Sequence, residues 1–301
     1  MFNFIKLLTY KVVPSWIYYR IVFLVNNIIL KKENHISFNK NNPKLIFDAV
    51  KNKFDYKKVF ILGSGSSINE LTNKNFDEIK NNCSIGINKW IFHRFVSNIY
   101  MIELNNDDDL NERVRVRILS LLKNKSKDPF FLIYNLANSN VDIQKWTKDM
   151  SPEKVFFYKF LRPNTFKKEI KKEFFNLLKF LPKINKLSNV ITIGAGSTIE
   201  RAIVLSLLFG SSKIILLGID LNNTKYFWSQ KDSNFKNIKS GQKNYGYHLT
   251  AIKRFGGIPA QKTILILEEL ARIQFKSKIF IATSKSLLSS ELKKYNWKKN
   301  D

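Results

Sequence analysis

The sequence has little cysteine and no long uninterrupted hydrophobic run, and each absence excludes a class of protein. Cys83 is the single cysteine among 301 residues, so no internal disulfide can form. No spacing of Cys, His, Asp and Glu matches a structural zinc site. We therefore expect a reducing compartment, most simply the cytoplasm.

Acidic residues are also few, with 24 Asp and Glu against 51 Lys and Arg, which gives a net charge of +27. Such an excess attracts polyanions, anionic lipid or phosphorylated ligands. The lysines are scattered through the chain, and no Arg-rich arm or basic repeat is present. This pattern favours a solvated basic surface, and no nucleic-acid partner is expected.

The N-terminal residues 1–32 are apolar and aromatic, but Lys6, Lys11, Pro14 and Arg20 interrupt them. A membrane-spanning helix needs about 20 nearly uninterrupted apolar residues, and we find no secretory cleavage site. A tryptophan and two tyrosines beside cations are typical of a segment lying in the membrane interface. We expect peripheral attachment to the inner face of a bacterial membrane, through a polar connector at residues 33–56. A helix packed on the core is the alternative.

From Lys57 onward, short runs of β-branched and aromatic residues alternate with helical patterns. This alternation predicts an α/β, Rossmann-like domain over residues 57–301, with a mostly parallel sheet and helices on both faces. Helices are expected at 197–209 and 259–275. The expected strands are 59–62, 83–88, 98–104, 130–136, 154–160, 213–220 and 278–284.

Two glycine-rich turns each join an expected strand to an expected helix: GSGSS at 63–67 and GAGST at 194–198. Glycines let the backbone approach a ligand closely, and free N–H groups at a helix start favour a phosphate. Asp220 ends a third strand. If all three strands belong to one parallel sheet, these groups meet at its carboxyl edge, where open α/β folds bind ligands. The alternatives are turns that only connect elements and an Asp that only caps one.

The order of these motifs resembles that of the bacterial family 42 glycosyltransferases, which are sialyltransferases using CMP-sialic acid, and of related flagellin-modification-type proteins. The resemblance covers about residues 57–290. Its donor loop corresponds to Gly63, Ser64, Gly65, Ser66 and Ser67, with Ser64 where the family has Asn. Its Cys-Asn-Gln corresponds to Ile87, Asn88 and Lys89. Its Thr-Ser-Gly and Gly-Ile-Asp motifs correspond to Ser197, Thr198 and Ile199, and to Gly218, Ile219 and Asp220.

The resemblance implies a GT-A-variant fold and an inverting transfer from a CMP-activated donor to a surface glycan or lipid-linked acceptor, with no metal or other cofactor. In the family, two tyrosines assist departure of the nucleotide phosphate. The first corresponds to Asn222 and the second to Tyr226. The family's general base corresponds to His248, which lies in a long aromatic-rich insertion at about 221–258 that we interpret as a lid. A homo-oligomer is possible on the sequence.

Three acidic residues after the strand at 98–104 support a rival hypothesis. Asp107 and Asp109 have the spacing with which metal-dependent transferases hold Mg²⁺ or Mn²⁺ beside a nucleotide diphosphate. The alternative is that these residues cap the following helix. A noncatalytic, basic protein that binds a membrane surface is a third hypothesis.

Overall fold

A computed structural model describes residue 21 and residues 50–124, 128–135, 141–163, 169–185, 191–222, 226–227 and 258–297. Eight strands form one sheet in the order β10-β9-β8-β1-β2-β3-β4-β5, and all neighbours pair in parallel. The α/β prediction is therefore confirmed. The strands are β1 (Lys58–Leu62), β2 (Cys83–Ile87), β3 (Ile99–Leu104), β4 (Phe130–Asn135), β5 (Val155–Phe157), β8 (Lys213–Leu217), β9 (Lys278–Ile281) and β10 (Lys293–Lys294).

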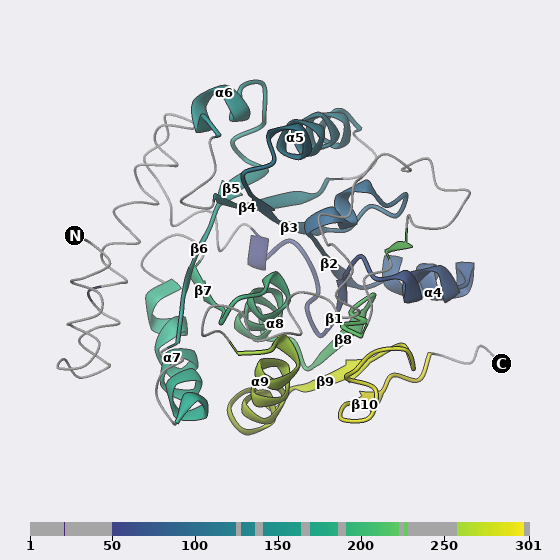
Figure 1. Ribbon diagram of the computed structural model, residues 1–301, viewed down its shortest axis with the longest axis vertical. Helices are drawn as coiled ribbons and strands as arrows, with labels where there is room; N and C mark the ends of the chain where they lie inside the picture. Colours follow the sequence, from purple (N-terminus) through teal and green to yellow (C-terminus); the bar gives the residue numbers. More distant parts are fainter. Residues whose placement is uncertain are drawn as a thin grey trace.

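Helices cover both faces of this sheet (Figure 1). One face carries α4 (Asn73–Lys80) and α5 (Asp108–Lys123), and the other carries α8 (Thr198–Leu208) and α9 (Ala260–Phe275). The chain runs from β1 through β2 to β5 in one direction and later from β8 to β10 in the other. Because such crossovers are right-handed, this reversal places helices on opposite faces.

The strand sequences are continuous apolar runs because both sheet faces are covered. Every residue of β2 is buried, and so are the last four of β1 and of β8. Helix α8 is apolar nearly all round, with its residues from Thr198 to Leu207 buried. This burial is typical of a helix enclosed by other elements, and α8 packs between the sheet and α9.

The sequence predicts one strand over the apolar segment 154–160, but the structure has two strands there. Strand β5 belongs to the large sheet, whereas β6 (Lys159–Leu161) pairs with β7 (Ile191–Ile193) in a separate two-stranded sheet. The prediction that the 194–198 turn follows a strand of the large sheet is therefore wrong. Tyr158, fully buried between β5 and β6, marks the break, and its N–H binds the carbonyl of Ile133. A uniformly apolar run gives no local signal of such a change of partner.

The described residues also form α6 (Ile143–Thr147) and the 3₁₀ helices η1 (Ser66–Glu70) and η2 (Asn88–Phe92). Helix α7 (Ile170–Asn185), which the sequence analysis does not predict, packs against β7 and α9. Val50 and Tyr56, inside the predicted connector, belong to the buried core. Residues 1–20 and 22–49 lie outside the described residues, as does most of the predicted lid. Among the helices that are described, none has the length and apolar character needed to cross a membrane.

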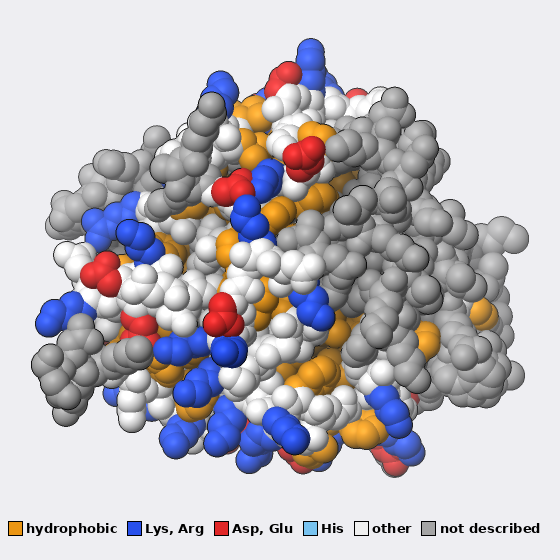
Figure 2. Space-filling model, turned by 180° about the vertical axis from the view of Figure 1, so that it is seen from behind, with side chains coloured by type: hydrophobic (Ala, Val, Ile, Leu, Met, Phe, Trp, Pro, Cys, Tyr) orange, Lys and Arg blue, Asp and Glu red, His pale blue; other side chains and the backbone are white. Residues whose placement is uncertain are grey.

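Cationic side chains are spread over the surface and gather along its lower rim in Figure 2, over α9, β9 and β10. Exposed lysines of these elements and their ends include Lys262, Lys276, Lys278, Lys293 and Lys294. The positive charge of these described elements therefore faces solvent, which agrees with the solvated basic surface that the scattered lysines predict.

Candidate functional site

The loops that follow β1 and β8 are bonded to each other at the carboxyl edge of the sheet. The N–H of Gly63 donates to the carbonyl of Leu217 and the N–H of Gly65 to the carbonyl of Gly218, both at 2.8 Å. Strand order reverses between β1 and β8. In open α/β folds this reversal opens a crevice that binds ligands.

Glycine is required here because two backbones nearly touch. A Cβ on Gly218 would lie 2.5 Å from the carbonyl oxygen of Gly63, and a Cβ on Gly65 would lie 2.6 Å from the carboxylate of Asp220. Gly218 also has φ +64°, which favours glycine. The glycines of both motifs therefore serve the contact between the loops.

Asp220 fixes the β1 loop. Its carboxylate accepts a hydrogen bond from the backbone N–H of Ser67 at 3.1 Å, another from the Ser67 hydroxyl, and a longer one from the Ser66 hydroxyl at 3.4 Å. Asp220 and Ser67 are each 4% exposed. Ser66, Ser67 and Asp220, three residues predicted to bind the nucleotide-sugar donor, thus lie together. Much of their hydrogen-bonding capacity is used in the bonds among them.

Asn88 connects the end of β2 with α8 and β3. It has a left-handed φ of 49°, a conformation that Asn tolerates better than most residues. Its side-chain amide donates to Thr198 Oγ1 at 3.0 Å and accepts from the backbone N–H of Glu103 at 3.1 Å. Thr198 in turn donates to Glu103 Oε2 at 3.1 Å. Asn88 and Thr198, both predicted to bind the nucleotide-sugar donor, are therefore in direct contact.

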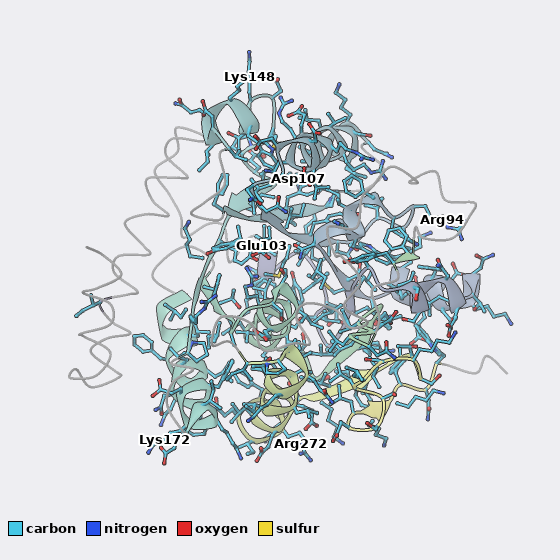
Figure 3. All side chains as sticks on the ribbon, viewed as in Figure 1. Arg94, Glu103, Asp107, Lys148, Lys172 and Arg272 are labelled. Atoms are coloured by element: carbon cyan, nitrogen blue, oxygen red, sulfur yellow. The ribbon has the colours of Figure 1, made fainter. Side chains whose placement is uncertain are left out.

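Glu103 and Arg201 extend this network, and the sequence analysis identifies neither. The guanidinium donates to Glu103 Oε2 at 3.2 Å, to the carbonyl of Ser197 and to the hydroxyl of Tyr158. Its carbon lies 4.5 Å from the ring centroid of Phe160. Arg201 is 1% exposed, whereas the Glu103 side chain is 27% exposed. In Figure 3, Glu103 lies near the centre of the molecule, while Arg94, Lys148, Lys172 and Arg272 point outward at its periphery.

The GAGST turn is filled by the carboxylate of Glu200. Glu200 Oε2 accepts from the backbone N–H groups of Ala195, Gly196 and Ser197 at 2.5, 3.1 and 3.4 Å, and Oε1 accepts from the hydroxyl of Thr263. These N–H groups therefore hold an internal anion. The hydroxyl of Ser197 is buried without a hydrogen-bond partner among the described residues.

Two of the described residues of the predicted lid, Tyr226 and Phe227, contact the β1 loop. Tyr226 pairs with Gly65 as an isolated bridge, and the N–H of Phe227 donates to the carbonyl of Ser64. Burial raises the pKa of Tyr226 to about 12, so its hydroxyl keeps its proton at neutral pH. Lys89 Nζ lies 5.4 Å from the centroid of the Tyr226 ring.

Asn222, the counterpart of the family's first tyrosine, turns toward another loop. Its side-chain amide donates to the carbonyl of Lys285 at 2.6 Å. His248, the predicted base, lies outside the described residues.

Another histidine, His93, is described, and its ring packs against Trp90, Phe76 and Phe227. Burial, with a smaller effect of Arg94, lowers the pKa of His93 to about 4.

The acidic residues after β3 begin α5. Asp107 is the N-cap, and its side chain accepts from the N–H of Leu110 at 3.0 Å, while Asp109 is exposed in the first turn. The capping alternative therefore holds for Asp107. No group of three His, Cys, Asp or Glu suited to a metal ion occurs in the part of the chain that the structure describes.

A cavity of about 270 Å³ borders the junction of β1 and β8. Its lining includes Ser67, Gly218, Thr283, Lys294 and Trp297. Hydroxyls beside an aromatic ring suit a ligand with a flat, polar ring. The cavity is smaller than most ligand pockets, so it suits part of a nucleotide sugar.

These features define an α/β protein with a polar crevice at the carboxyl edge of a parallel sheet. Among solved structures, the fold is similar to that of the monofunctional α-2,3-sialyltransferase Cst-I from Campylobacter jejuni, with a TM-score of 0.45 and 13% sequence identity. The match covers 81% of this chain and 82% of that one. Comparison with known protein families and with curated proteins gives no match. At this level the likeness does not identify the activity.

Proposed function

We propose that this chain is a glycosyltransferase that moves a sugar, with inversion, from a CMP-activated donor to a glycan or lipid-linked acceptor. One observation supports this most: the motifs that resemble the family 42 transferases gather at one edge of the sheet. Gly65 bonds Gly218, Ser67 bonds Asp220, and Asn88 bonds Thr198. These contacts bring together loops that are far apart in the sequence.

The proposed reaction breaks the bond between the anomeric carbon and a phosphate oxygen, which leaves with the bonding electron pair on CMP. The acceptor oxygen bonds the carbon from the opposite face and loses its proton to a base, for which we propose His248. Groups that donate to the developing phosphate charge accelerate such a step. Tyr226 is suited to this role because its hydroxyl stays protonated.

Thermal unfolding with CMP, UMP, UDP and GDP tests the donor class. A ligand that binds only the folded state stabilises it by RT ln(1 + [L]/Kd), so the unfolding temperature rises with the logarithm of the ligand concentration above Kd. CMP is expected to raise it at millimolar concentration, and UMP and GDP to have little effect. A shift with UDP and Mn²⁺ but none with CMP contradicts the proposal and favours the metal-dependent alternative.

We also propose that the protein is peripheral to the membrane through residues 1–32. The cationic and aromatic composition of that segment supports this placement. Sedimentation with anionic vesicles is expected to carry down the full chain and not a chain lacking residues 1–30. If the shortened chain is folded and sediments equally well, this placement is wrong.

A further inference from the structure

The cavity beside the junction of β1 and β8 is built from segments that are distant in the sequence. Its lining comes from η1 and α4, from the end of β8, from the residues after β9, and from β10 and the residues after it. Ser67 and Gly218 belong both to this lining and to the bonded loops of the crevice. The cavity therefore adjoins the residues predicted to bind the donor, although other side chains complete it.

Trp297 provides an aromatic wall whose orientation is fixed by packing. Its ring is parallel to that of Phe60, with 5.9 Å between the centroids and 5° between the planes, and the ring of Tyr295 meets it at 85°. Phe60 and Tyr295 are buried in the core, whereas Trp297 is only partly buried and lines the cavity. A ring held in this way loses little conformational freedom when a planar ligand stacks on it.

Polar groups lie around the same cavity. Thr283 Oγ1 accepts from the backbone N–H of Lys285 at 3.1 Å, and a hydroxyl that accepts one bond can still donate its own proton. Ser284, which is exposed, adds a second hydroxyl. The carboxylate of Glu70 is paired with the ammonium of Lys285, while the exposed Lys294 adds a positive charge. This balance of charge favours a ligand that carries a negative group.

The rest of the lining is largely apolar and includes Ile68, Leu71 and Ala282. A sugar ring carries hydroxyls around its whole circumference, and a hydroxyl that is buried without a partner costs free energy. A nucleobase has two apolar faces and carries its polar atoms along the edge of the ring. An aromatic wall, apolar side chains and a few hydroxyls therefore suit a base better than a sugar.

We propose that this cavity binds the base of the nucleotide donor. The base stacks on Trp297, and its polar edge bonds to the hydroxyls of Thr283 and Ser284. This inference rests on the proposed function, and it adds three residues that the sequence analysis does not identify. Because hydroxyls can both donate and accept, they can satisfy donors and acceptors on the edge of a pyrimidine alike.

Titration calorimetry with CMP and with ribose 5-phosphate isolates the contribution of the base, because the two ligands share the ribose and the phosphate. The wild-type chain is expected to bind CMP about tenfold or more tightly, since stacking of a base on an aromatic side chain has that strength. Trp297→Leu is expected to lower the affinity for CMP to that for ribose 5-phosphate. Trp297→Tyr, which keeps an aromatic ring, is expected to retain most of the difference.

A second variant tests the cavity and leaves the packing of Trp297 on Phe60 in place. Ser284→Phe introduces a ring from an exposed position and is expected to fill the cavity and weaken CMP binding about tenfold. Its effect on ribose 5-phosphate is expected to be small. Ser290→Phe is the matched control, because Ser290 is an exposed serine of the same segment and does not line the cavity. This control is expected to bind CMP as the wild type does.

The outcomes separate this inference from the proposed function. If folded Trp297→Leu and Ser284→Phe both bind CMP as the wild type does, the base lies elsewhere, although the donor class stands. If the wild type binds CMP and ribose 5-phosphate equally, the cavity holds no base and the inference is wrong. If the wild type binds neither ligand, the proposed function fails and this inference with it. Ser284→Phe decides the question alone if Trp297→Leu does not fold.

Discussion

Replacing Asp220 by alanine is expected to destabilise the protein strongly, because Asp220 ties the β1 loop to the end of β8. Its carboxylate accepts from both the backbone N–H and the hydroxyl of Ser67. Hydrogen bonds to a charged group contribute about 1.5–3 kcal/mol each. The two bonds to Ser67 therefore contribute about 3–6 kcal/mol to the free energy of unfolding, since burial of both residues keeps water from replacing them.

Urea unfolding followed by tryptophan fluorescence measures this change. Asp220→Asn keeps one acceptor oxygen and is expected to lose about 1–2 kcal/mol. Asp77→Ala is the control, because Asp77 is exposed on α4 and such surface changes stay within about 0.5 kcal/mol. If Asp220→Ala loses no more than Asp77→Ala, the carboxylate does not hold the two loops together, and the description of the crevice is wrong.

Three further predictions concern the same region. Gly65→Ala places a Cβ 2.6 Å from the Asp220 carboxylate and should lower the free energy of unfolding by about 1–3 kcal/mol. A Cβ on Gly196 meets nothing within 4 Å, so Gly196→Ala should lower it far less. Equal losses of the two variants in urea unfolding contradict this prediction. Arg201→Lys should lower the free energy of unfolding by about 1–3 kcal/mol, because one ammonium cannot replace the three guanidinium nitrogens that bond Ser197, Tyr158 and Glu103. A loss below about 0.5 kcal/mol argues against a structural role for this network. The pKa of His93 is about 4 in the folded state and about 6.5 when unfolded, so the unfolded chain binds the extra proton between these values. Stability is then full above pH 6.5 and falls by about 3 kcal/mol toward pH 4, and this part of the pH dependence should disappear in His93→Phe.

The turns of the site were predictable from local sequence, but their partners were not. Gly63 and Gly65 directly after an apolar run indicate a tight strand-to-helix turn, and the structure has one there. That the turn is held by Asp220, more than 150 residues away, depends on strand order. The prediction that the turn at 194–198 follows a strand of the large sheet was wrong, because the strand before it, β7, pairs with β6 in the two-stranded sheet.

The buried network around Arg201 was missed for a related reason. Arg201 stands in an otherwise apolar helix, which is a signal that a sequence reader can use: a charge on a face expected to be buried needs a partner. Which partner it finds cannot be read locally, because Glu103 lies 98 residues earlier in the chain. The assignment of His248 as base stays a prediction, since it lies outside the described residues.

The sequence by itself determined the class of fold and the places where polar turns interrupt it. Apolar residues that recur every two or 3.6 positions, and glycines at strand ends, are patterns within a few neighbouring residues. They can therefore be recognised in the sequence alone. Only the tertiary structure decided which polar groups bond to one another inside the protein. The carboxylate of Glu200 fills one turn, and the carboxylate of Asp220 holds another. Those outcomes depend on contacts between distant segments, which form only when the whole core packs.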